Sequence, residues 1–239
     1  MGAGVMLVGR SRYCDYPAEV SRIPVVGGYV DPSFEAILAL DPDLVMGARG
    51  PAGAAITERL ESRGIRTFFP QTETISAIEA MISGLAKLLN RTAQADQLIV
   101  EVNQTLAKID HVLQAYPRPR TLLVFGLTPT VAAGPGSFAD EMLTRAGGSN
   151  VIQVGPRYPT LGVEDVIAAD PDVVIDAAVA EGHGKERIGA ERPGWSALRA
   201  VQQGRVATVD DNAVLRPGPR VAAGVGTLAR LLHPGVDLR

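Results

Sequence analysis

Two stretches of the chain repeat one pattern and place a carboxylate at the same position in it. FEAILALDPDLV (34–45) aligns without a gap with VEDVIAADPDVV (163–174), so Glu35 corresponds to Glu164. The Asp-Pro-Asp and aliphatic positions predict a helix, a turn and a strand. The glutamates fit two hypotheses. Each lies early in its helix, where an acid complements the macrodipole; alternatively, equivalent exposed carboxylates on two lobes form matched docking charges for a two-fold partner.

No recognisable catalytic motif occurs in the sequence. The chain has no P-loop, no G-x-S-x-G and no H-E-x-x-H, and its carboxylates form no recognisable acid–base pair with a nucleophile. AAGPGSFADEM (132–142) has the glycine content of a phosphate-binding loop at a helix N-terminus, but it lacks the P-loop lysine. We therefore expect a binding protein without catalytic residues, and phosphate binding stays a minor alternative.

Residues that ligate metals are few and scattered. A lone cysteine such as Cys14 is more often a small apolar filler than a ligand. His111, His183 and His233 show no H-x-x-x-H spacing, so no zinc site is expected. His183, in the loop EGHGKE, is the one histidine that we consider as a haem or cobalt ligand. His233 lies at a predicted helix C-terminus, where a cation is favoured.

The composition is that of an ordinary globular protein. Of the 239 residues, 46% are hydrophobic and 21% charged, and the net charge of −3 gives no case for nucleic acid or an anionic membrane as a partner. No apolar run reaches the roughly 18–20 residues of a membrane span. The first residues do not have the pattern of a signal peptide. The protein is therefore expected to be cytoplasmic, or exported with a leader outside this chain.

The first part of the chain predicts alternating strands and helices. The apolar run VMLVG (5–9) predicts a buried strand. Residues 31–47 predict a helix that Asp31 can cap, followed by a strand, and residues 54–70 repeat helix and strand. This βαβα order implies a mainly parallel sheet covered by helices.

Helical periodicity then runs through residues 74–115, and its second helix extends for about 23 residues, or roughly 35 Å. A second α/β set follows from residue 121 to the C-terminus. The simplest fold is an α/β protein in which two lobes with mainly parallel sheets are joined by one long rigid α-helix. The predicted boundaries are residues 1–91 for the N-terminal lobe, 92–117 for the helix and 118–239 for the C-terminal lobe.

Six segments in order resemble one known family. They are VGRSRYCDYP, FEAILALDPDLVMG, SFADEMLTRAGGSNVI, YPTLGVEDVIAADPDVVI, GWSALRAVQQGRV and RPGPR. Together they resemble the class III substrate-binding proteins of ABC importers for vitamin B12, haem and iron–siderophores, most of all the cobalamin-binding branch. The resemblance covers essentially the whole chain, although a strand and a helix that usually open the N-terminal lobe are not seen before residue 1.

The resemblance implies residues for the ligand. It places Tyr13 and Tyr29 of the N-terminal lobe, and Tyr158, Asn212 and Arg216 of the C-terminal lobe, at positions that contact the ligand between the lobes. Tyrosine replaces tryptophan at two of these positions, and Ala48 stands at a third tryptophan position, so the aromatic cleft is thinner. Aromatic rings suit the apolar face of a corrin, and polar groups suit its amides.

The resemblance also implies a partner protein and a cellular location. Glu35 and Glu164 match the glutamates that form salt bridges with arginines of the permease dimer. We expect a monomeric, extracytoplasmic protein, periplasmic or membrane-anchored, that captures a corrinoid and needs no resident cofactor. Haem or a ferric siderophore is the alternative metal chelate, and a cytoplasmic α/β enzyme is the alternative of another class.

Overall fold

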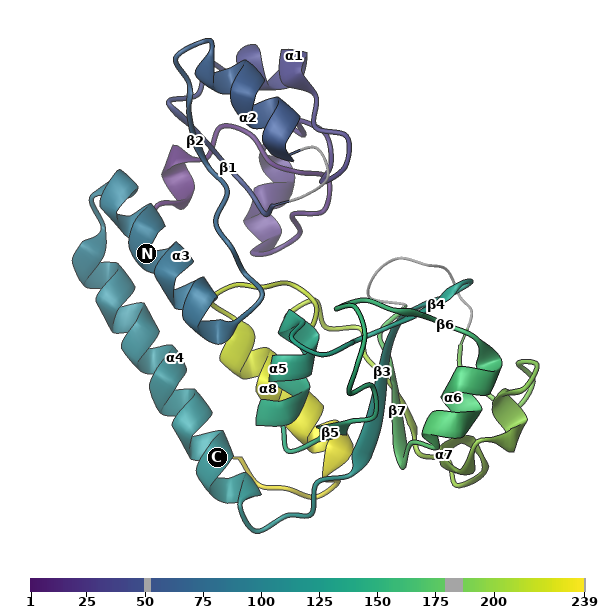
Figure 1. Cartoon of the computed structure of the whole chain (residues 1–239). Helices are drawn as coiled ribbons and strands as arrows, with labels where there is room; N and C mark the ends of the chain where they lie inside the picture. Colours follow the sequence, from purple (N-terminus) through teal and green to yellow (C-terminus); the bar gives the residue numbers. More distant parts are fainter. Residues whose placement is uncertain (50–52, 179–186, 239) are drawn as a thin grey trace. The chain divides into compact units, whose positions relative to one another are not determined.

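The computed structural model describes residues 1–49, 53–178 and 187–238, which form an α/β protein of two compact units (Figure 1). The N-terminal unit comprises Met1–Thr72 and Glu79–Asp96, and the C-terminal unit comprises Glu73–Ile78 and Gln97–Arg239. The predicted α/β class is confirmed. The three lobe and helix boundaries expected from the sequence stay a prediction.

The N-terminal unit contains the two helix–strand repeats that the sequence predicted. Helices α1 (Phe34–Leu38) and α2 (Gly53–Glu61) precede the parallel strands β1 (Leu44–Met46) and β2 (Arg66–Phe68). A small core is formed by Phe34, Ile37, Ile56 and Leu60. Because the strands are parallel and adjacent, the loops that follow β1 and β2 lie at one edge of this sheet.

Two local predictions for this unit are wrong. Residues 5–9 form no strand: Gly4–Met6 is a 3₁₀ turn (η1), and Val5 is 95% exposed. No strand among the described residues pairs with this run, and an apolar run is buried as a strand only where a neighbour satisfies its backbone. Helix α1 is capped by Ser33, whose Oγ accepts from Ala36 N at 3.2 Å, because Asp31 is instead bound by Arg12.

Two long helices follow, as the periodicity predicted. Helix α3 (Ile75–Leu89) is joined by a short turn to α4 (Thr92–Leu113), whose 22 residues span about 33 Å at 1.5 Å per residue. Asn90 makes the turn in the left-handed region, with φ of 54°. No helix among the described residues has the length and apolarity that crossing a membrane requires.

The C-terminal unit is built on a six-stranded mixed sheet. Its strands are β3 (Arg120–Leu127), β4 (Thr130–Ala132), β5 (Ser149–Asn150), β6 (Thr160–Leu161), β7 (Val173–Asp176) and β8 (Val206–Thr208). Strands β5, β7 and β8 run parallel in the ladders with β3 and β7, whereas β4 and β6 form an antiparallel edge in the order β6-β4-β3-β7-β8. This edge was not predicted from the sequence, because strands β4 and β6 have only three and two residues.

Helices cover both faces of that sheet. Figure 1 shows α5 (Phe138–Arg145) and α8 (Val221–Leu232) on one side, and α6 (Val163–Ala169) and α7 (Arg199–Gln202) on the other. The short 3₁₀ turn η3 (Trp195–Ala197) buries Trp195 to 2% exposure beside Leu122, Val174 and Leu198. Trp195, the only tryptophan of the sequence, is therefore a core residue.

The repeated Asp-Pro-Asp has a conformational cause. Asp41 and Asp170, its first residues in the two copies, both adopt the left-handed region, with φ of 45° and 37°. Helices commonly end on a residue in this region, and aspartate reaches it at lower cost than most residues with a Cβ. The turn is thus repeated because each of the two helices must end and be followed by a strand in the same way.

His233 does not carry the helix-end charge expected of it. It is 6% exposed, its ring contacts Tyr116 at 5.3 Å between centroids, and its Nε2 makes no hydrogen bond within the described chain. A Cβ on Gly147 would lie 2.6 Å from Nε2, so the close packing requires glycine there. Burial lowers the pKa of His233, and Arg205 and Arg118 lower it further, against the raising effect of the Ala146 and Gly147 backbone.

The left-handed turn predicts a difference between two substitutions at Asp41. Asp41→Gly should be at least as stable as the parent, whereas Asp41→Ala should be about 1 kcal/mol less stable than the glycine variant, because Ala pays the full cost of positive φ. Urea unfolding followed by circular dichroism measures both. Equal stability of the two variants would contradict the conformational account of the repeat.

The buried His233 predicts a loss of stability in mild acid. Its pKa is lowered in the folded state, so the unfolded chain binds the proton first as pH falls below the ordinary value of about 6.5. The contribution is complete above that pH and decreases as the pH falls below it. His233→Gln should flatten this slope of the unfolding free energy, with His111→Gln on α4 as the control; an unchanged slope would refute the assignment.

Candidate ligand-binding site

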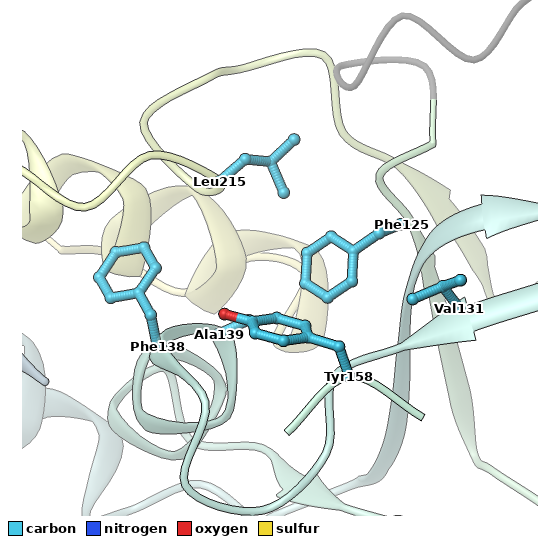
Figure 2. Close-up of a pocket in the computed structure, with 6 residues that line it drawn as sticks. All are labelled: Phe125, Val131, Phe138, Ala139, Tyr158 and Leu215. Atoms are coloured by element: carbon cyan, nitrogen blue, oxygen red, sulfur yellow. The ribbon is translucent and has the colours of Figure 1, made fainter. Parts of the chain in front are cut away.

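A pocket opens in the C-terminal unit at the end of its parallel strands. It has a volume of about 250 Å³ and is lined by Phe125, Val131, Phe138, Ala139, Tyr158 and Leu215 (Figure 2). Phe125 comes from the last part of β3, Phe138 and Ala139 open α5, and Leu215 lies in the turn before α8. Parallel α/β sheets bind ligands outside the carboxyl ends of their strands, and this pocket follows that rule.

Tyr158 forms one wall of the pocket and is fixed at both ends. Its ring meets Phe125 edge-on, with 5.8 Å between centroids, and its hydroxyl donates to Glu73 Oε2 at 3.1 Å. In Figure 2 the hydroxyl points toward the Phe138 end of the pocket. The side chain remains 46% exposed, so a fixed aromatic face is presented to solvent. Such a face suits a flat, partly apolar ligand.

Glu73, which the sequence analysis did not single out, also caps a helix. The same Oε2 accepts from Phe138 N, the first amide of α5, at 3.2 Å. In return Glu141 of α5 accepts from Ile75 N, the first amide of α3, at 2.8 Å. We call these two bonds the reciprocal clasp. The first amide of each helix thus donates to a carboxylate that belongs to the other helix or directly precedes it. These bonds satisfy amides that would otherwise lack a partner.

The helix N-terminus within residues 132–142, where Glu73 binds, was considered as a phosphate-binding site. The amides at this helix N-terminus already have acceptors, since Asp140 N donates to Ser137 Oγ and Gly136 N to Asp140 Oδ2, in addition to Phe138 N to Glu73. An anion site needs such amides to be available, and here carboxylates of the chain occupy it. This stretch is therefore a capped helix start that shapes the pocket.

Two further predicted residues lie in the turn that carries Leu215. The carbonyl of Asn212 accepts from Leu215 N at 3.2 Å and from Arg216 N at 3.0 Å, and the carboxylate of Asp211 accepts from Ala213 N at 2.8 Å. This turn places Leu215 in the pocket wall, and half-buried Arg216 follows it directly. Asn212 and Arg216 are thus joined to the pocket through Leu215, and their contact with a ligand stays a prediction.

In the N-terminal unit, Tyr29 belongs to a chain of bonds at the strand ends. Its hydroxyl donates to the carbonyl of Arg49 at 2.9 Å, and Arg49 Nε donates to the carbonyl of Phe69 at 3.1 Å. Arg49 follows β1 and Phe69 follows β2, so Tyr29 is tied to the carboxyl edge of this small sheet. The tyrosine remains exposed there.

Arginines hold the loop that carries Tyr13. Arg10 donates to the carbonyls of Ile23, Ser11 and Cys14 at 3.1–3.2 Å, which gathers the loop around one guanidinium. Arg12 makes a bidentate pair with Asp31 at 2.6 and 2.8 Å and lies 5.8 Å from the centre of the Tyr13 ring. The Arg12 guanidinium lowers the pKa of the Asp31 carboxyl. The exposed Tyr13 thus stands on an ordered loop.

The two repeated glutamates are exposed and cap neither helix. Ser33 caps α1, and Asp165 accepts from Gly162 N at 2.9 Å at the start of α6. Glu164 is exposed, and the Glu35 side chain is 84% exposed, 3.8 Å from Arg59. Capping is therefore performed by other residues, and the macrodipole is the remaining structural reason for two equivalent acids.

The described residues contain no group of three His, Cys, Asp or Glu side chains that could hold a metal ion. Cys14 is exposed, so the filler role expected of it is wrong. His111 is exposed on α4 and His233 is buried at the end of α8. His183 lies outside the described residues.

Comparisons with known proteins identify the family of the chain. The sequence profile described as periplasmic binding protein matches residues 1–213. The chain belongs to the periplasmic binding protein family. This membership confirms the resemblance. The chain is an extracytoplasmic binding protein and not an enzyme.

Three relatives illustrate the family. A vitamin B12-binding protein of Salmonella typhimurium is 31% identical over 179 residues, which cover 74% of this chain and 67% of that protein. An uncharacterised ABC transporter substrate-binding lipoprotein of Bacillus subtilis, YvrC, is 26% identical, with 98% and 75% covered. The structure of the periplasmic haem-binding protein BhuT in complex with two haems has a TM-score of 0.83 at 28% identity, with 97% and 90% covered.

Proposed function

We propose that this binding protein captures a corrinoid outside the cytoplasm and delivers it to the permease of an ABC importer. The observation that carries the proposal is the apolar pocket beside the last part of β3, with the Tyr158 ring fixed as one wall. A corrin is larger than about 250 Å³, so the pocket would hold one part of the disc and the rest would extend over Tyr158.

Several further features support this proposal. Cobalamin is the ligand named for the Salmonella relative, and its corrin ring combines an apolar face with amide side chains. Tyr13 and Tyr29 of the N-terminal unit are exposed aromatic residues of a kind that suits a corrin face, and Asn212 and Arg216 are polar residues of the turn that carries Leu215. Binding is non-covalent, the metal chelate is cargo, and no resident cofactor takes part.

Haem is the second candidate ligand. The likeness to BhuT favours it, as does half-buried Arg216, which follows Leu215 of the pocket wall. An arginine pairs well with the carboxylates that haem carries and a corrin lacks. A ferric siderophore is the third chelate of the same class.

For delivery, we propose that Glu35 and Glu164 dock the protein, as a monomer, onto arginines of a two-fold permease dimer. Their equivalent places in the repeat and their exposure support this role, since capping is done by other residues. Exposed charges of this kind steer and orient a partner more than they hold it. We further propose that the protein is periplasmic or anchored to the outer face of the membrane, as the lipoprotein relative is named.

The ligand proposal predicts a hierarchy in calorimetric titration. Cyanocobalamin should bind more tightly than haemin or a ferric siderophore, and Tyr158→Ala should weaken it about tenfold, because a desolvated aromatic contact is lost. Val100→Ala, which trims a 51% exposed side chain of α4, is the control and should bind as the parent does. Tighter haemin binding would move the assignment to haem, and no binding of any of the three would refute the proposed function.

The docking proposal predicts that transport and affinity separate. Glu35→Lys with Glu164→Lys should reduce uptake of labelled cobalamin by more than tenfold and leave the dissociation constant unchanged, because both side chains are exposed and neither lines the pocket. Uptake by proteoliposomes that contain the permease measures this. Glu101→Lys on α4 is the control; equal loss of affinity and uptake would contradict a docking role.

A further inference from the structure

Glu73 stands beside the candidate pocket with one carboxylate oxygen engaged. Both of its described hydrogen bonds go to Oε2, from Tyr158 OH at 3.1 Å and from Phe138 N at 3.2 Å. These two donors belong to residues of the pocket wall. The carboxylate is therefore held at the hydroxyl end of Tyr158.

The second oxygen, Oε1, remains an available acceptor. Among the described residues no hydrogen bond reaches it, and no described ion pair involves Glu73. It is not one of the buried polar atoms without a partner, and the residue is half-buried, so solvent reaches it. A ligand that extends from the pocket over Tyr158 would meet a fixed negative charge that accepts and cannot donate.

Such a charge separates ligands by the groups on their rim. A side-chain amide offers an N–H to Oε1, which makes a charge-assisted hydrogen bond. A carboxylate at the same place offers no donor and repels the glutamate, and this repulsion is stronger in a partly desolvated pocket than in water. Selection against the wrong ligand by an unfavourable contact is a common basis of specificity.

We infer that Glu73 is a specificity-determining residue, whose carboxylate at the Tyr158 edge of the pocket selects ligands with amide rims over ligands with carboxylate rims. The inference rests on the proposed function, because it assigns the contact that distinguishes an amide-bearing corrinoid from its acidic analogues. Glu73 is held by two hydrogen bonds from residues far away in the sequence, and no local motif marks it.

The test uses one ring with one group changed. Cyanocobalamin and its monocarboxylic acids, in which one propionamide is hydrolysed, are titrated into the full chain and into Glu73→Gln by calorimetry. The parent should bind at least one of these acids about tenfold more weakly than cyanocobalamin. Glu73→Gln keeps a side-chain oxygen that can accept from Phe138 N and Tyr158 OH. It should reduce that ratio to about one to two, because the neutral glutamine amide can hydrogen-bond to either a carboxylate or an amide of the ligand.

Two more variants complete the test. Glu73→Asp keeps the charge and should preserve discrimination in the same direction, whereas Glu101→Gln on α4, with the same loss of charge at a distant exposed place, should keep the parent ratio. If the parent binds cyanocobalamin and Glu73→Gln leaves the ratio unchanged for every acid, the inference is overturned. If the parent binds no cobalamin at all, it is the proposed function that fails.

Discussion

The reciprocal clasp between Glu73 and Glu141 is the interaction on which the candidate site depends. Each carboxylate accepts the first amide of the other segment's helix, and Glu73 also accepts the hydroxyl of Tyr158. Helix caps of this kind are worth about 1 kcal/mol each, a modest amount. Their positional effect is larger, because one carboxylate binds both the first amide of α5 and the hydroxyl of Tyr158. The pocket wall follows from these two placements.

Both units use the same helix-to-strand turn, but different arginine contacts order the loops of each unit. Both copies of the repeat turn from helix to strand through an aspartate in the left-handed region. In the C-terminal unit the aspartates of that turn, Asp170 and Asp172, also pair with Arg199 at 3.1 and 2.9 Å. In the N-terminal unit the ordering of the loops is taken over by Arg10 and Arg12.

What the sequence could predict was whatever depends on neighbours along the chain. Helix periodicity and the Asp-Pro-Asp turns are local signals, and they predicted α3, α4 and the helix–strand order of the repeat. The run at 5–9 shows the limit, since apolar letters indicate a strand only if a partner strand pairs with them, and none of the described ones does. Asp31 failed as a cap for the same reason, because Arg12, 19 residues away, binds it.

In the candidate site, too, some residues were predicted from the sequence and others were not. Tyr158 was identified through the family resemblance, and it lines the pocket. Glu73 was missed, because its partners lie 65 and 85 residues away and its own neighbours carry no motif. The short antiparallel edge of β4 and β6 was missed as well, although it carries Val131 into the pocket. Long-range bonds between ordinary residues leave no mark in a single sequence.

The central claim is that the wall made by Phe125, Tyr158 and Leu215 is a corrinoid site. A crystal structure of the protein grown with cyanocobalamin tests it most directly. The account predicts the edge of the corrin in this pocket, one face against the Tyr158 ring and a side-chain amide within hydrogen-bond distance of Glu73 Oε1. Cobalamin bound elsewhere on the C-terminal unit, with the Tyr158 ring still open to solvent, would contradict it.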